Sequence, residues 1–203
     1  MSTKDRTLLV ATTNPGKLRE IAAILAGVPL TLLTLDDCEP VEEPEETGAT
    51  FAENARLKAH YYAKATGRLS VADDSGLEIE ALDNAPGVHS ARWYGADYAV
   101  KFRMIQELLQ ARGASGSRAR FVCHVAVARR DEILFEAEAT VEGVIVADPR
   151  GENGFGYDPI FFYPPLGRTL AELDADDKSR VSHRGKAFAA LRDHLITHPV
   201  LIG

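Results

Sequence analysis

The chain has 203 residues, of which 45% are hydrophobic, and it carries a formal net charge of −7. This length and composition suffice for one compact domain, or for one domain with two lobes. The negative charge argues against a general nucleic-acid binder, which needs a basic face to displace counterions.

No apolar run approaches the roughly 18 residues of a membrane-spanning helix. The N-terminus also lacks the apolar stretch of a signal peptide, so we expect a cytoplasmic protein with no membrane partner. The two cysteines, Cys38 and Cys123, form no ligand pattern and are expected to be reduced and structural. Neither an H-E-x-x-H nor a C-x-x-C motif is present, which leaves a zinc site without support.

The chain begins with a predicted buried strand over Thr7–Thr12, then a helix that starts at Pro15 with Asn14 as its N-cap. A helix N-terminus after a polar loop offers free backbone N–H groups to an anion. Lys17 lies in the first helical turn, where the macrodipole disfavours a cation, and a bound phosphate would remove that conflict. The alternative is a solvated lysine beside a capped helix. The stretch is not a P-loop, because Leu18 replaces the required Ser or Thr and the leading glycine is missing.

A second strand is predicted over Val28–Leu35, parallel to the first if the helix is a crossover. The acidic, proline-containing segment Asp36–Gly48 is predicted to be a loop, which by default is a solvated surface. A long helix follows over Thr50–Thr66, with Thr50 and Glu53 as a capping box. Lys58 of this helix is either solvated or directed into a cleft.

The adjacent carboxylates Asp73–Asp74 are predicted to lie in a tight turn between two strands, Leu69–Ala72 and Leu77–Ala81. Carboxylates at the end of a buried strand are suited to holding a hard cation or activating water. An Asx-turn is the structural alternative. If a cation binds there, Glu45 or Glu46 of the acidic loop is the expected second carboxylate.

The second half of the chain continues with an irregular segment, Asn84–Trp93, interpreted as a functional or dimer-contact loop. A helix is predicted from Asp97, and a hairpin is predicted from Arg118–Arg130 and Glu132–Val146. Ile160–Phe162 is predicted to be a further buried strand.

Two later stretches carry features of a ligand site. In Arg150–Pro159, three glycines alternate with two aromatic residues. Such glycines allow close approach of a ligand and an aromatic ring can stack on a base, although a wide loop with aromatic plugs is the alternative. In Lys178–Lys186, cations and a histidine cluster where the last helix begins, repeating the dipole conflict of Lys17. Together with the carboxylate pair, these stretches indicate a phosphate- and base-binding cleft with a metal.

These motifs resemble those of the inosine triphosphate pyrophosphatase family, enzymes that hydrolyse non-standard purine nucleoside triphosphates. The matches follow the family's order and span almost the whole chain. They are T-T-N-P-G-K at Thr12–Lys17, E-E-T-G at Glu45–Gly48, A-D-D-S-G-L at Ala72–Leu77, A-P-G-V-H-S-A-R at Ala85–Arg92, F-G-Y-D-P at Phe155–Pro159 and S-H-R-G at Ser182–Gly185.

The resemblance implies an α/β fold, with an elongated mixed sheet, flanking helices and two lobes around a central nucleotide cleft. Residues 1–203 would form a single nucleoside-triphosphate pyrophosphatase domain. The family is usually homodimeric and acts on a small-molecule nucleotide with Mg²⁺ as cofactor. It cuts between the α- and β-phosphates, which gives nucleoside monophosphate and pyrophosphate.

The resemblance also assigns roles to individual residues. Asp74 would bind the metal and activate water, with Glu46, Glu45 and Asp73 completing the Mg²⁺ site. The residues that would hold the triphosphate are Thr12, Thr13, Asn14, Pro15, Gly16, Lys17, Lys58 and Ser75. Phe155 would stack on the purine, beside Gly156 and Tyr157. The base edge would be read by Asp158, Lys178, His183 and Arg184.

The expected activity is therefore hydrolysis of ITP, dITP and XTP, which would cleanse the nucleotide pool. A donor directed at the purine 6-oxo group would reject ATP, whose 6-amino group would oppose it. Two alternatives remain: a pyrophosphatase for other modified nucleotides, such as those with altered pyrimidines, and a nucleotide sensor without turnover. The Asp73–Asp74 pair argues against the sensor, which needs no water-activating carboxylate.

Overall fold

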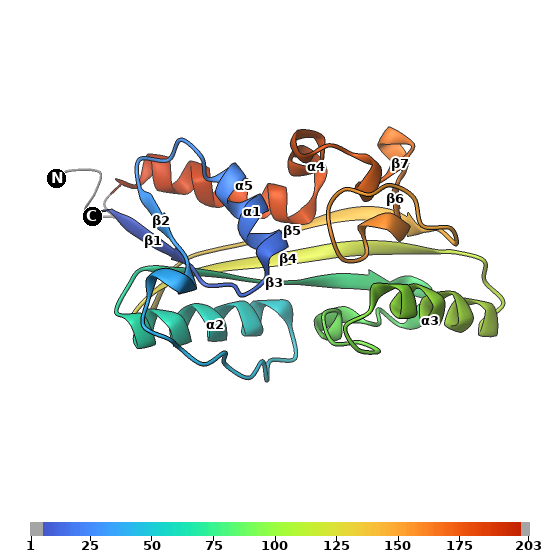
Figure 1. Ribbon diagram of the computed structural model, residues 1–203, viewed down its shortest axis with the longest axis horizontal. Coiled ribbons are helices and arrows are strands. Elements are labelled where there is room, and N and C mark those ends of the chain that lie inside the picture. Colours follow the sequence, from blue (N-terminus) through green and yellow to red (C-terminus); the bar gives the residue numbers. More distant parts are fainter. Residues whose placement is uncertain (1–5, 200–203) are drawn as a thin grey trace. The chain divides into compact units, whose positions relative to one another are not determined.

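The computed structural model describes residues 6–199 (Figure 1). Its main elements are β1 Thr7–Val10, α1 Pro15–Ile24, β2 Thr31–Leu33, α2 Phe51–Thr66, β3 Ser70–Ile79, α3 Tyr98–Ala111, β4 Ser117–Arg129, β5 Glu132–Ile145, β6 Phe161–Tyr163, β7 Arg168–Thr169, α4 Ala175–Val181 and α5 His183–Thr197. Within these described residues, no helix is both long enough and apolar enough to cross a membrane.

The strands form one mixed sheet in the order β2-β1-β3-β4-β5-β6-β7. Strand β1 is parallel to both β2 and β3, whereas β6 is antiparallel to both β5 and β7. The helices flank this sheet, so the predicted α/β fold with a mixed sheet is confirmed. The predicted hairpin is also present, with Arg130 at a φ of 55° between β4 and β5.

The chain divides into two compact units. The first holds the chain up to Asp74, together with Cys123–Ala139 and the chain from Arg184 onward. The second consists of Ser75–Val122 and Thr140–His183. Strands β3, β4 and β5 each contribute residues to both units.

In the first unit, the sheet has a hydrophobic core on each face. Leu8 and Val10 of β1 pack into the core formed with α1 and α5, whereas Leu9 packs into the core formed with α2. Figure 1 shows α1 and α5 on one side of these strands and α2 on the other. Because parallel strands of this kind are buried on both faces, the apolar run Leu8–Ala11 shows no polar alternation.

The second unit has a single core. It joins the end of β3, through Leu77 and Ile79, to Ile105 and Leu109 of α3 and to Phe161 of β6. All five side chains are fully buried. The helix predicted from Asp97 is thus confirmed, with Asp97 as the N-cap of α3.

Two strand predictions need correction. The tight turn predicted at Asp73–Asp74 is wrong, because β3 runs without interruption from Ser70 to Ile79. Its Asp, Ser and Gly residues are typical of turns, but partners on both faces of the sheet keep this segment extended. The second strand is also shorter than predicted: β2 covers only Thr31–Leu33, because Pro29 lacks a ladder donor and a 3₁₀ turn begins at Leu35.

Candidate active site

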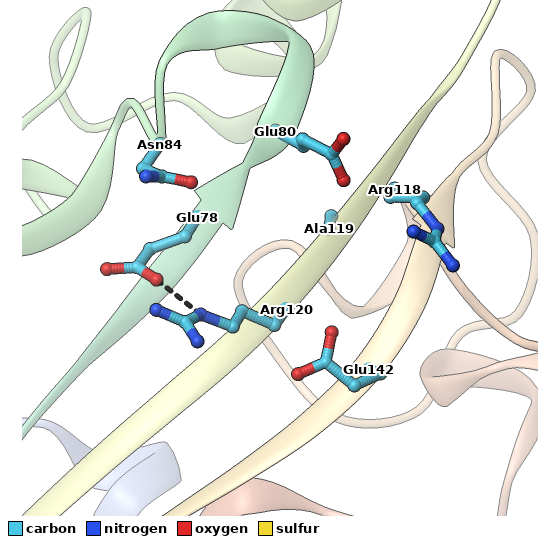
Figure 2. A pocket seen from close by; sticks show the side chains of 7 residues that line it. All are labelled: Glu78, Glu80, Asn84, Arg118, Ala119, Arg120 and Glu142. Carbon is cyan, nitrogen blue, oxygen red and sulfur yellow. Dashed lines mark hydrogen bonds and ion pairs between the residues drawn. The ribbon is translucent and has the colours of Figure 1, made fainter.

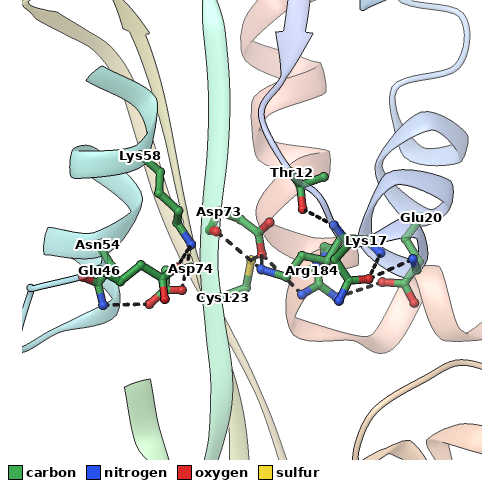
Figure 3. A network of polar contacts seen from close by, with 12 residues as sticks. Thr12, Lys17, Glu20, Glu46, Asn54, Lys58, Asp73, Asp74, Cys123 and Arg184 are labelled. Carbon is green, nitrogen blue, oxygen red and sulfur yellow. Dashed lines mark hydrogen bonds and ion pairs between the residues drawn. The ribbon is translucent and has the colours of Figure 1, made fainter. Parts of the chain in front are cut away.

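Strand β3 carries the central carboxylates of the site. Consecutive side chains of a strand point to opposite faces, so Asp73 and Asp74 cannot share one environment. Figure 3 shows their carboxylates leaving opposite sides of β3, each within a separate group of polar residues. Both side chains are buried.

On the face of Asp74, helix α2 supplies an ammonium and an amide. Lys58 Nζ lies 2.9 Å from Asp74 Oδ1 and 2.6 Å from Glu46 Oε1. Asn54 Nδ2 donates to Asp74 Oδ2 at 3.2 Å, while Asn54 Oδ1 accepts from the N–H of Gly48 at 2.8 Å. Residues four apart on a helix share a face, which brings Asn54 and Lys58 to the same carboxylate. The acidic loop is thereby tied to β3.

The electrostatics of this group suit a reactive carboxylate. Burial raises the pKa of Asp74, and the nearby Lys58 only partly offsets that effect. The pKa of Lys58 is itself raised: burial opposes the charge, but the carboxylates of Asp74, Asp73 and Glu46 outweigh it. Lys58 therefore stays an ammonium, and Asp74 is a stronger base than an exposed carboxylate.

The carboxylates of Asp74 and Glu46 also fit a divalent cation. Both already place an oxygen around one positive group, the Lys58 ammonium. Mg²⁺ is commonly held by one or two carboxylates, with substrate phosphates and water completing its shell. Over residues 6–199, no cluster of three or more His, Cys, Asp or Glu side chains has metal-site geometry. Glu45, the other candidate of the loop, is exposed.

On the opposite face, Asp73 joins two cations. Its Oδ2 lies 3.0 Å from Lys17 Nζ and 3.3 Å from Arg184 Nη2. Arg184 Nη1 in turn donates to Glu20 Oε2 at 2.9 Å, and the thiol of Cys123 donates to Asp73 Oδ2 at 3.7 Å. Asp73 thus holds a lysine of α1 and an arginine of α5 in place.

This pairing sets the charge of Asp73. Burial acts to raise its pKa, but Lys17 and then Arg184 dominate and hold the pKa of Asp73 well below its usual range. The same carboxylate explains how Lys17 is tolerated in the first turn of α1, where no acidic residue offsets the macrodipole.

The N-terminus of α1 differs from the prediction. Asn14 is the N-cap as expected, and its Oδ1 accepts from the N–H groups of Gly16 and Lys17 at 2.8 and 3.1 Å. The N–H of Leu18 donates to the Asn14 carbonyl at 3.0 Å, and Pro15 has no N–H. The expectation of free helical N–H groups is therefore wrong, because the cap satisfies the donors of the first turn.

The predicted hydroxyl ligands lie beside this cap or on β3. Thr12 Oγ1 accepts from the N–H of Asn14 at 3.2 Å. Thr13 is exposed, with its Oγ1 3.5 Å from Glu43 Oε1. Ser75 continues β3 and is half-buried. Their contacts with phosphate remain predictions.

In the second unit, Asp158 organises the glycine- and aromatic-rich loop. Its Oδ2 accepts from the N–H of Phe155 at 2.8 Å and from Lys178 Nζ at 2.5 Å. The Lys178 ammonium lies 4.9 Å from the centre of the Phe155 ring. A Cβ at Gly154 would come within 2.2 Å of Asp158 Oδ2, so this glycine makes room for the ion pair.

The residues around Phe155 pack into the unit. Tyr157 is buried, and its hydroxyl donates to the carbonyl of Ser90 at 2.9 Å. Gly156 precedes it with a φ of +71°, a conformation that favours glycine. His183, at the start of α5, stacks on the Phe121 ring with a centroid distance of 4.7 Å and an interplanar angle of 9°.

A surface pocket of the second unit lies outside the predicted residues (Figure 2). Its walls carry mixed charges, and Arg120 pairs with Glu78 at 2.6 Å. The lining residues are Glu78, Glu80, Asn84, Arg118, Ala119, Arg120 and Glu142. None of the predicted site residues lines this pocket.

Two residues of the polar network were not predicted from the sequence. Asn54 and Glu20 hold Asp74 and Arg184, respectively. Helical spacing gave a signal for both, because Asn54 precedes Lys58 by four residues and Glu20 follows Lys17 by three.

Comparison with known proteins identifies the family. A sequence model of the Ham1 family matches residues 8–194. The chain belongs to this family. The resemblance inferred from the motifs is thereby confirmed.

Curated relatives and solved structures agree with this assignment. The chain is 48% identical over 191 residues to a Geobacter sulfurreducens protein named dITP/XTP pyrophosphatase, covering 93% of this chain and 96% of the relative. A Thermus thermophilus protein of the same name is 50% identical over 186 residues, covering 91% and 89%. The structure of a HAM1 protein from Coxiella burnetii has a TM-score of 0.86 and 40% identity, covering 95% of this chain and 99% of that one. These relatives confirm the predicted class of enzyme, a nucleoside-triphosphate pyrophosphatase.

Proposed function

We propose that this protein hydrolyses dITP, XTP and ITP to nucleoside monophosphate and pyrophosphate. The observation that carries the proposal is the group on one face of β3, where Asp74 and Glu46 share the Lys58 ammonium. The names of the Geobacter and Thermus relatives, dITP/XTP pyrophosphatase, support the same reaction and the choice of base.

In this proposal, Asp74 and Glu46 hold Mg²⁺. The bound cation would neutralise phosphate charge and act as a Lewis acid. Glu45 is exposed and Asp73 is turned to the other face of β3, so neither is included in the proposed ligand set.

Asp74 also accepts the proton of the attacking water. Its two oxygens are oriented by Lys58 and Asn54, and burial raises its pKa. Proton transfer to this carboxylate would produce the hydroxide that attacks a phosphorus atom of the α–β anhydride. The bridging P–O bond would break, which separates nucleoside monophosphate from pyrophosphate.

The triphosphate is held by cations and hydroxyl groups. Lys17 is presented by Asp73, and Lys58 is presented by Asp74 and Glu46. Because Asn14 satisfies the first turn of α1, we assign phosphate binding here to the Lys17 side chain and the hydroxyls of Thr12 and Thr13, rather than to helical N–H groups. Such fixed cations stabilise charge that moves onto the leaving pyrophosphate.

Base recognition is assigned to the second unit. Phe155 offers a stacking surface, and Lys178 beside it carries only donors. A donor matches the 6-oxo group of hypoxanthine and xanthine, whereas the 6-amino group of adenine would place donor against donor. Asp158 fixes both residues, and His183 is held flat against Phe121.

Both terminal nitrogens of Arg184 contact Glu20 or Asp73, so we assign Arg184 to positioning Asp73 rather than to the base.

The expected homodimer and the expected cytoplasmic location stay predictions, as does action on one small-molecule nucleotide without a nucleic-acid partner. Altered pyrimidine nucleotides remain the alternative substrate class.

The proposal is tested by measuring the products formed from XTP, dITP, ITP, GTP, ATP and an altered pyrimidine triphosphate, each with and without Mg²⁺. Pyrophosphate from XTP, dITP and ITP, dependent on Mg²⁺ and with little from ATP or GTP, is the expected result. Orthophosphate as the primary product would contradict the assigned cut. Saturable XTP binding without turnover would instead favour a nucleotide sensor.

A further inference from the structure

Lys101 of α3 is a lysine in the interior of the second unit. Its exposed fraction is 0%, although lysine is among the residues least often buried completely. Among the described residues no carboxylate forms an ion pair with it. Burial lowers its pKa, and no opposing acidic group accompanies that effect.

The ammonium of Lys101 binds backbone carbonyls instead. It donates to the carbonyl of Ala91 at 2.7 Å and to that of Ser90 at 3.1 Å. It also lies 4.3 Å from the centre of the Tyr98 ring, within the range of a cation–π contact. An apolar side chain could fill the same volume, but it would remove the Lys101 donor from the buried Ser90 carbonyl and from the partly buried Ala91 carbonyl.

The same carbonyl connects Lys101 to the loop that carries Phe155. The hydroxyl of Tyr157 donates to the Ser90 carbonyl at 2.9 Å, so this oxygen receives both Lys101 and Tyr157. The Tyr157 ring packs edge-on against Tyr98, with centroids 5.2 Å apart. Lys101 therefore supports Tyr157 through a shared acceptor and a shared aromatic neighbour.

Phe155 is consequently fixed from two directions. Its own N–H is held by Asp158, which pairs with Lys178. Two residues further on, Tyr157 is anchored to Ser90. Loss of the second anchor would leave the first in place but free the backbone between them to shift.

We propose that Lys101 is a positioning residue for base recognition, which holds the Phe155 loop through Ser90 and Tyr157. This inference rests on the proposed function, since it assumes that Phe155 stacks on the purine. Lys101 is too deeply buried to touch the substrate, so its effect is on the binding and choice of the base.

The test is the variant Lys101→Met, which keeps the volume and removes the donor. We expect the KM for XTP to rise about tenfold with kcat little changed, the size expected when one buried polar link is lost. The preference for XTP over ATP, measured as a ratio of kcat/KM values, should fall by a similar factor. Tyr157 directly precedes Asp158, which holds the Lys178 donor for the 6-oxo group, and ATP has no 6-oxo group to accept from that donor.

Two further variants keep the test decisive. Arg103→Gln is the matched control on α3, because its side chain is 64% exposed and its ion pair with Glu107 is long, at 3.9 Å. It should behave as wild type. Tyr157→Phe removes the hydrogen bond from the Tyr157 hydroxyl to Ser90 and leaves Lys101 unchanged. It should shift KM and selectivity in the same direction as Lys101→Met. If Lys101→Met fails to fold, this variant tests the proposal by itself.

Unchanged KM and unchanged selectivity in the folded variants would overturn the inference. So would a loss of kcat with selectivity intact, which a purely structural role would produce. If the wild-type protein itself does not hydrolyse XTP, the proposed function fails first, and that result is distinct from a failure of the role of Lys101.

Discussion

Asp73 and Asp74 are neighbours in the chain, yet their surroundings have opposite effects. Lys17 and Arg184 hold the pKa of Asp73 low, whereas burial raises that of Asp74 despite the Lys58 ammonium. The first carboxylate is paired with two cations, and the second is the proposed general base and metal ligand. The alternation of a strand lets adjacent residues take these separate roles.

Different elements contribute the partners of the two carboxylates on the two faces of β3. Helix α2 and the acidic loop serve the Asp74 face, through Asn54, Lys58 and Glu46. Helices α1 and α5 serve the Asp73 face, through Lys17 and Arg184. A substitution on the Asp74 face should therefore change the rate of hydrolysis. A substitution on the Asp73 face should change the stability of the protein and its binding of phosphate.

The largest effect is expected from Asp74→Asn. Loss of the carboxylate removes the general base and a proposed metal ligand, so kcat for XTP should fall by about 10³-fold or more. The asparagine can still accept from Asn54, and Lys58 keeps Glu46, so the urea-unfolding midpoint should change little. A steady-state assay with an unfolding curve checks both; activity near that of wild type would contradict the assignment.

Asp73→Asn should show the reverse pattern. Removing the charge leaves the buried Arg184 and Lys17 with less compensation, and the free energy of unfolding should fall by about 3 kcal/mol. Turnover of XTP should decrease less than in Asp74→Asn. Urea denaturation measures the change in the free energy of unfolding. Combining the substitution with Lys17→Met gives a double-mutant cycle, and additive losses would show that the two side chains are not coupled.

The acidic loop offers a matched pair. Glu46→Gln should raise the Mg²⁺ concentration for half-maximal activity by about tenfold, because it removes one of the two proposed carboxylate ligands. Glu45→Gln, at the exposed neighbouring position, should leave that concentration unchanged. Titrating activity against Mg²⁺ in both variants checks this; equal shifts would mean that the loop acts through its overall charge.

The smallest effect concerns Cys123 on the Asp73 face. Burial, reinforced by Asp73, raises the pKa of its thiol, so it should resist alkylation in the native protein. Cys38 is half-buried and should react first. Mass spectrometry after iodoacetamide treatment distinguishes the two; rapid labelling of Cys123 would indicate that this face opens readily.

Local signals in the sequence predicted where α1, α2 and α3 begin, whereas α4 was not predicted. Thr50 and Glu53 form the capping box of α2, and Asn14 caps α1 as expected. These features depend on residues close together in the chain, so a sequence pattern contains them. The grouping of Phe155 with Lys178 was also indicated, because the family resemblance assigned both residues to the base.

The errors arose where distant contacts decide the structure. Asp73 and Asp74 have the composition of a turn, but Lys17, Lys58 and Arg184 stabilise the extended form from both faces. For the same reason, the sequence could not show that the two carboxylates diverge. The lack of free N–H groups in α1 likewise depends on the orientation of one side chain, that of Asn14.

The division of roles across β3 is tested most directly by Mg²⁺ binding in Asp73→Asn and Asp74→Asn. Calorimetric titration with Mg²⁺, in the presence of a non-hydrolysable XTP analogue, gives the Mg²⁺ affinity of each variant. We expect Asp74→Asn to lose Mg²⁺ affinity by about 10-fold or more, and Asp73→Asn to keep the wild-type affinity. Equal losses in the two variants, or a larger loss in Asp73→Asn, would contradict the account.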